Sequence, residues 1–116
     1  PLACAVGSKV LDTIARKEFL ESVNRKAGFF RQKLESVIDE NPKIFDHVRG
    51  QGLMLGLKCK VPNLDVVSCA YEQKLLLVPA ADNTVRLLPA LNIPEVDLQE
   101  AILRLEKTAL SLEKKL

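Results

Sequence analysis

Apolar residues recur every three or four positions along the first part of the chain, a spacing that predicts helical structure ending at Asn41-Pro42. The pattern changes phase near Arg16-Lys17-Glu18, where neither proline nor glycine interrupts the chain. One kinked helix and two separate helices therefore both fit residues 1–41. The apolar positions before the change are Leu2, Val6, Val10 and Ile14, and those after it are Phe19, Val23, Ala27, Phe30, Leu34 and Val37.

Alternation of apolar and polar residues predicts strands in the middle of the chain. The first covers residues 53–59, the second Leu75–Val78 and the third Val85–Leu88. A short helix that begins at Pro62-Asn63 separates the first two, and residues 79–83 form a loop before the third. The apolar positions are Leu53, Leu55, Leu57 and Cys59 in the first strand, and Leu64, Val67 and Tyr71 in the short helix.

A last helix is predicted from Pro94-Glu95 onward, with Glu95 and Asp97 in its first turn, where acidic groups suit the helix dipole. It is too short to argue for a coiled coil, so we expect it to pack on the sheet. The order of elements predicts a single α+β domain over residues 1–116, with a small antiparallel or mixed sheet of about three strands covered by helices. The apolar positions of this helix are Leu98, Ile102, Leu105, Ala109, Leu112 and Leu116.

Composition excludes several classes of partner. The 17 basic and 15 acidic residues give a net charge of only +2, whereas nucleic-acid-binding domains concentrate positive charge. Aromatic residues make up 4%, too few for a base-stacking surface. No apolar run approaches the length that a bilayer requires, so neither nucleic acid nor membrane is expected as a partner.

The cysteines and the single histidine do not predict a metal or a disulfide site. Cys4, Cys59 and Cys69 are odd in number and irregularly spaced, which fits buried thiols in a reducing cytosol. Together with His47 they match no zinc spacing. We expect His47 at the surface, in a polar connection after Asp46.

Gly50 and Gly52 form a G-x-G pattern that precedes a predicted strand. A dinucleotide-binding loop lies instead at the turn from a strand into a helix, so this pattern is not its fingerprint. We expect these glycines to permit a bulge or the close approach of another backbone segment.

Arg86 is the candidate site residue, because it places a permanent charge within the apolar segment Val85-Arg86-Leu87-Leu88. Alternation puts Arg86 and Leu88 on one face of the strand and Val85 and Leu87 on the other. A guanidinium there must reach water or meet an anion. Two interpretations follow: an ion pair with one of the chain's own Asp or Glu residues, or a bidentate contact with the carboxylate of a ligand.

The start of the chain is unusual, since Pro1 enters helical spacing at once, without an initiator methionine or a capping side chain before it. We therefore expect the chain to be a piece of a larger protein, cut just before a helix.

Three segments resemble class III aminotransferases, which are pyridoxal-phosphate enzymes of fold type I. They are Pro1–Ala5, Val48–Gly56 and Val85–Asn92, and they occur in the family's order and at suitable intervals over essentially the whole chain. The resemblance implies that residues 1–116 are the C-terminal small domain of such an enzyme, with residues 1–41 leading from an absent large domain. It also implies a homodimer.

What the resemblance implies about residues is limited to one position. The family's arginine in the R-x-x-P-x-L stretch binds the α-carboxylate of the amino-acid substrate, and it corresponds to Arg86 here. The family's Schiff-base lysine and phosphate-binding segment lie upstream of Pro1. We therefore expect no catalytic, cofactor-binding or metal-binding residue in this chain, and an inactive fragment. One departure concerns Ala81, which stands where the family often has glycine, so a turn with positive φ beside Arg86 is in question.

The implied reaction of the intact protein is amino transfer from N-acetylornithine to 2-oxoglutarate, in the cytoplasm. Ornithine, 4-aminobutyrate and succinylated diaminopimelate intermediates stay open as alternative amino donors. Two other classes also stay open: a free-standing regulatory module that binds an amino acid through Arg86, and a plain interaction domain in which Arg86 is part of a structural ion pair.

Overall fold

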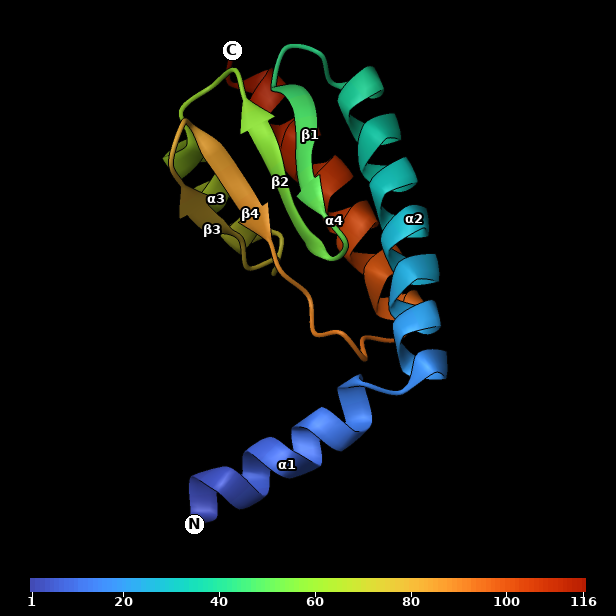
Figure 1. Ribbon diagram of the computed structural model, residues 1–116. Coiled ribbons are helices and arrows are strands. Elements are labelled where there is room, and N and C mark those ends of the chain that lie inside the picture. Colours follow the sequence, from blue (N-terminus) through green and yellow to red (C-terminus); the bar gives the residue numbers. More distant parts are fainter.

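The structure, a computed structural model, describes residues 1–116. Its sheet has four antiparallel strands in the order β1-β2-β4-β3, one more than the sequence predicts. Three helices cover one face of this sheet and leave the other face bare, while α1 extends away from the rest (Figure 1). The elements are α1 (Leu2–Ile14), α2 (Lys17–Glu40), β1 (Phe45–Gln51), β2 (Met54–Cys59), α3 (Asn63–Glu72), β3 (Val78–Ala80), β4 (Thr84–Leu87) and α4 (Glu95–Lys114).

The core lies between the sheet and helices α2, α3 and α4. The apolar face predicted for residues 53–59 is confirmed, because Leu53, Leu55, Leu57 and Cys59 are all buried. The stripe predicted for α4 is confirmed from Leu98 to Leu112, but Leu116 lies beyond the helix and is exposed. The α2 stripe is buried in its second half, at Phe30, Leu34, Val37 and the neighbouring Ile38.

The change of phase near Arg16 proves to be a break between two helices. Arg16 has an extended backbone conformation, with ψ of 136°, and α2 starts at the next residue. The stripe of α1 stays largely uncovered, and none of the residues of α1 is buried. The pattern thus predicted the helix correctly, but the other elements described do not bury its apolar side.

Two strand predictions are wrong. The segment Phe45–Gln51, of which Asp46 and His47 were expected in a polar connection, forms the edge strand β1, whose mixed side chains hide the alternation. Residues 75–77 are not a strand; Lys74 has a positive φ and Leu76 is exposed, so the strand begins only at Val78 and includes Pro79 and Ala80. Proline is tolerated because β3 is the other edge of the sheet.

The buried face of α3 also differs from the prediction. Of the predicted positions, Leu64 and Tyr71 are exposed and Val67 is only partly buried against the core, whereas Val66, Cys69 and Ala70 are buried. Small side chains at two of these three positions let α3 pack closely against α4, where the Cys69 thiol lies 3.6 Å from the Thr108 carbonyl oxygen. The small size of the side chains, more than their hydrophobicity, therefore determines which face of α3 is buried.

Gly50 and Gly52 shape the hairpin that joins β1 to β2. Gln51 pairs with Met54, so Gly52 is the first residue of a two-residue turn and has φ of 59°. Gly50 has φ of 114°, and a Cβ atom at this position would lie 2.1 Å from the Met54 carbonyl oxygen. The expectation that glycine permits close backbone approach is confirmed at Gly50.

We predict that Gly50→Ala lowers the free energy of unfolding by roughly 2 kcal/mol or more, because it combines a strained φ with a backbone clash. Gly28→Ala is the matched control, since nothing lies within 4 Å of a Cβ at this position in α2. It should change stability by less than about 1 kcal/mol, in the stabilising direction. Urea unfolding of both variants provides the test, and equal effects would contradict the role given to Gly50.

Candidate functional site

Strand β4 directs Arg86 toward the bare face of the sheet. Its neighbours Val85 and Leu87 are buried against the helices, so alternation turns Arg86 the other way, as predicted. The side chain is exposed and belongs to no ion pair of the chain. The interpretation of Arg86 as half of an internal ion pair is therefore wrong, and its guanidinium is free to meet an external anion.

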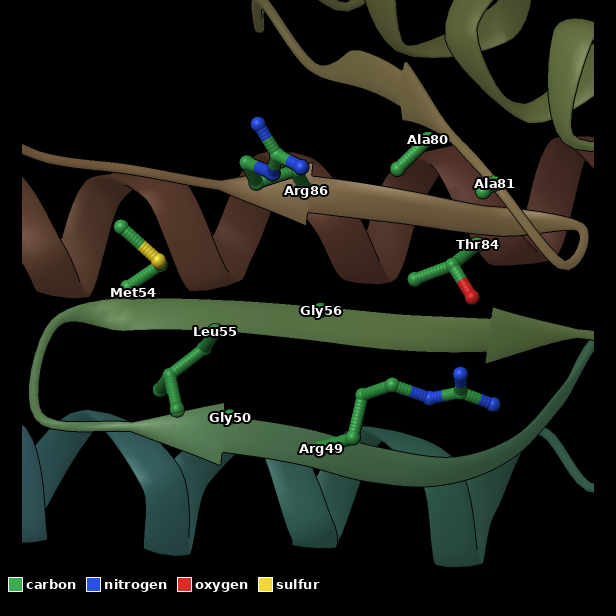
Figure 2. A pocket seen from close by; sticks show the side chains of 9 residues that line it. All are labelled: Arg49, Gly50, Met54, Leu55, Gly56, Ala80, Ala81, Thr84 and Arg86. Atoms are coloured by element: carbon green, nitrogen blue, oxygen red, sulfur yellow. The ribbon is translucent and has the colours of Figure 1, made fainter.

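Arg86 lines an open cavity of about 260 Å³ on this face (Figure 2). Arg49 of β1, Gly56 of β2 and Arg86 of β4 form one row across the sheet, since Gly56 pairs with both arginines. Gly56 has no side chain to separate them. The cavity is lined by Arg49, Gly50, Met54, Leu55, Gly56, Ala80, Ala81, Thr84 and Arg86.

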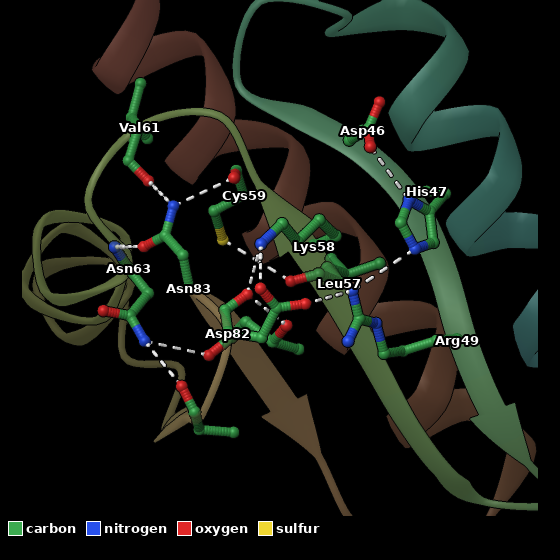
Figure 3. Close-up of polar contacts among 12 residues, drawn as sticks. Asp46, His47, Arg49, Leu57, Lys58, Cys59, Val61, Asn63, Asp82 and Asn83 are labelled. Carbon is green, nitrogen blue, oxygen red and sulfur yellow. Dashed lines mark hydrogen bonds and ion pairs between the residues drawn. The ribbon is translucent and has the colours of Figure 1, made fainter.

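Asp82 lies at one end of this surface and binds two cations (Figure 3). Its Oδ2 accepts a hydrogen bond from Arg49 Nη2 at 2.9 Å, and its Oδ1 accepts one from Lys58 Nζ at 2.8 Å. These two contacts, that from Lys58 first, hold the pKa of the Asp82 carboxyl below its ordinary value. Of the three cationic side chains Arg49, Lys58 and Arg86, only Arg86 is left without a carboxylate partner.

An amide pair anchors the loop that bears Asp82. The Asn83 side chain accepts a hydrogen bond from the Asn63 backbone N–H at 2.8 Å and donates to the carbonyl oxygens of Cys59 and Val61, both at 2.9 Å. Asn63 in turn donates from its own side chain to the carbonyl oxygens of Ala80 and Thr84. The loop before β4 is thereby fixed to the end of β2 and to the start of α3 (Figure 3).

The alanine at position 81 does not strain this loop. Positive φ values occur at Asp82, 57°, and Asn83, 48°, and not at Ala81. Asp and Asn are the residues that tolerate this conformation best after glycine. The departure from the family pattern therefore leaves the loop beside Arg86 intact.

The remaining predicted residues lie outside the cavity. His47 is exposed as expected, but in β1, where its Nδ1 lies 2.9 Å from Asp46 Oδ2; this hydrogen bond is the main cause of a lowered pKa of Asp46. Cys59 and Cys69 are buried, and burial raises the pKa of the Cys59 thiol to about 11. Cys4 is exposed, so the prediction of a buried thiol is wrong there, because α1 buries none of its residues.

No group of three or more His, Cys, Asp and Glu side chains could hold a metal ion. The cavity also lacks a lysine for a Schiff base, and Lys58 on the same face is held by Asp82. None of the four helices combines the length and apolar character needed to cross a bilayer.

Sequence reasoning missed Arg49, Asp82 and the two asparagines. Arg49 was missed because no strand was predicted at β1, and its alignment with Arg86 depends on the pairing of three strands. Asn83 follows Asp82 directly before a strand, a pairing typical of a turn with positive φ, and this signal could have identified the loop.

Comparison with known proteins gives consistent matches. A sequence profile described as aminotransferase class-III matches residues 1–109. The chain is 57% identical over 113 residues to an acetylornithine aminotransferase of Rhodobacter capsulatus, which covers 97% of this chain. The structure of N-acetylornithine aminotransferase from Stenotrophomonas maltophilia K279a covers the whole chain with a TM-score of 0.91 at 28% identity. That of ornithine delta-aminotransferase from Plasmodium falciparum does so with 0.89, also at 28% identity.

The chain spans only part of each of these proteins. It corresponds to 29% of the length of the Rhodobacter capsulatus relative, and to 33% and 31% of the two solved chains.

We predict that Asn83→Ala destabilises the protein far more than Asp82→Asn. The former removes three hydrogen bonds to backbone groups and places alanine at positive φ, for a loss of roughly 2 kcal/mol or more. The latter removes only exposed ion pairs and keeps a residue that tolerates the turn. Urea unfolding of both variants at neutral pH measures the difference.

Acid should remove the small contribution of Asp82. Its pKa is lowered in the folded state, so its stabilising effect is present above the unfolded value near 3.8 and is lost as the pH falls through the folded value. The stability difference between the wild type and Asp82→Asn should therefore be constant near neutral pH and shrink below about pH 4. A difference that grows on acidification would contradict this assignment.

Proposed function

Because the chain belongs to the class III aminotransferase family, we propose that the protein containing it transfers the amino group of N-acetylornithine to 2-oxoglutarate. The products are N-acetylglutamate semialdehyde and glutamate, in a step of arginine biosynthesis. The observation that supports this proposal is the free guanidinium of Arg86 on the bare face of the sheet. The similarity to acetylornithine aminotransferases favours N-acetylornithine over ornithine as the amino donor.

Arg86 would bind the α-carboxylate of each amino acid and oxo acid. Its planar fork matches the two carboxylate oxygens, so a single contact fixes both the position and the orientation of the substrate. Gly56 contributes no side chain to this cavity, whose lining beside Arg86 includes the small residues Ala80, Ala81 and Thr84. Orientation of this kind contributes to rate by holding the reacting amino group in place.

The family implies pyridoxal phosphate, whose chemical contribution is to act as an electron sink. The groups that bind it would come from the rest of the protein. In this proposal, residues 1–116 form the C-terminal small domain, and residues 1–41 connect it to a large domain. We also propose a homodimer in the cytoplasm, where three free thiols suit a reducing environment.

We predict that Arg86→Leu in the full-length protein lowers kcat/KM for both glutamate and N-acetylornithine by roughly 100-fold or more, because two charge-assisted hydrogen bonds are lost. Arg86→Lys keeps the charge without the fork and should lie between the wild type and Arg86→Leu. Arg25→Leu on the exposed side of α2 is the control and should be unchanged. Steady-state kinetics with each substrate provide the measurement.

The same assay tests the amino donor. N-acetylornithine should give a higher kcat/KM than ornithine or 4-aminobutyrate. If Arg86→Leu lowered kcat/KM for no substrate, the role given to Arg86 would be wrong. If ornithine gave the higher kcat/KM, the proposed amino donor would be wrong.

The domain arrangement makes a second prediction, about α1. If α1 packs on the large domain, Val6→Asp should lower the free energy of unfolding of the full-length protein by about 2 kcal/mol or more, because it places a charge in an apolar interface. Leu110→Asp on α4 is a matched control: the two residues are similarly exposed here, 56% and 55%, but Leu110 lies on the compact part. Urea unfolding that shows equal small effects would contradict the packing of α1.

A further inference from the structure

The bare face of the sheet presents a cation from each of three adjacent strands. Arg49, Lys58 and Arg86 project from β1, β2 and β4 on the side away from the helices. An acidic ligand entering the cavity would be attracted by any of the three. Productive binding through Arg86 therefore requires that the other two be engaged elsewhere.

We propose that Asp82 is a positioning residue that occupies Arg49 and Lys58 and so leaves Arg86 as the single free cation for the carboxylate of the substrate. The inference rests on the proposed function of Arg86 and adds to it a determinant of binding mode. In this proposal Asp82 contacts neither the substrate nor the reacting atoms, and it acts only through Arg49 and Lys58.

The geometry makes Arg49 a real competitor. Arg49 and Arg86 are separated by two strand spacings, or about 10 Å between their Cα atoms, with only Gly56 between them. Both side chains line the same cavity, so a dicarboxylate such as 2-oxoglutarate could be drawn to the wrong arginine or bridge the two.

Asp82 is well placed to prevent this. Each of its carboxylate oxygens binds a different cation, Oδ1 with Lys58 and Oδ2 with Arg49. Its backbone is held as well, since its carbonyl oxygen accepts hydrogen bonds from Lys58 Nζ and the Thr84 hydroxyl. The contacts of the carboxylate with Lys58 and Arg49 lower the pKa of Asp82, which favours its charged form.

The test is inhibition by glutarate, a dicarboxylate that has the length of 2-oxoglutarate and no oxo group. In the full-length holoenzyme, Asp82→Asn frees Arg49 and Lys58 while keeping a residue that tolerates φ of 57°. Glutarate should then inhibit about tenfold more tightly, the effect of about one new charge-assisted hydrogen bond. Asp82→Gly, which also accommodates the turn, serves if the asparagine variant does not fold.

Two further variants assign the effect. Adding Arg49→Gln and Lys58→Gln to Asp82→Asn should restore the wild-type inhibition constant. Asp65→Asn is the control, because Asp65 is exposed on α3 and belongs to no ion pair of the chain; it should leave glutarate inhibition unchanged.

The proposal is overturned if glutarate inhibits Asp82→Asn and Asp82→Gly no more tightly than it inhibits the wild type. It is also overturned if the tighter inhibition persists after both cations are removed. Failure of the proposed function has a different signature, since glutarate and 2-oxoglutarate would then bind Arg86→Leu as well as they bind the wild type. A loss of binding in Arg86→Leu together with no effect in Asp82→Asn overturns only the role of Asp82.

Discussion

Alternation along β4 couples the position of the free charge to the packing of the core. Val85 and Leu87 are buried against the helices, and because side chains alternate along a strand, Arg86 lies on the opposite face. A shift of β4 by one residue would bury the Arg86 guanidinium and expose two core side chains. The hydrophobic effect therefore stabilises the observed register of β4. The bare face of the sheet exists because α2, α3 and α4 all lie on the other side (Figure 1).

The loop before β4 adds a second, polar constraint. Asn83 and Asn63 satisfy backbone groups from β2, α3 and the two ends of the loop, and in doing so they fix where Asp82 points. Asp82 then gathers the cations of two strands. Apolar packing orients Arg86, and hydrogen bonding orients its surroundings, so the two kinds of interaction meet at one cavity.

The elements that sequence periodicity predicted well are those with a long or clean apolar pattern. The stripe of α4 and the alternation in β2 identify their buried faces directly, and the face of Arg86 follows from four residues. Periodicity failed at β1, an edge strand with mixed side chains, and at α3, where small residues were needed for close packing. The row that joins Arg49 to Arg86 could not be predicted, because it depends on which strands pair and in which register.

The small residues Ala80 and Ala81 line the cavity, so a substitution there can change the size of the cavity without changing the core. Neither belongs to the buried core, and both line the cavity beside Arg86. Larger side chains at these positions would narrow the space offered to a ligand without disturbing the packing behind the sheet. Descendants of this fold can therefore diverge in the size of molecule they accept while inheriting the same folded scaffold.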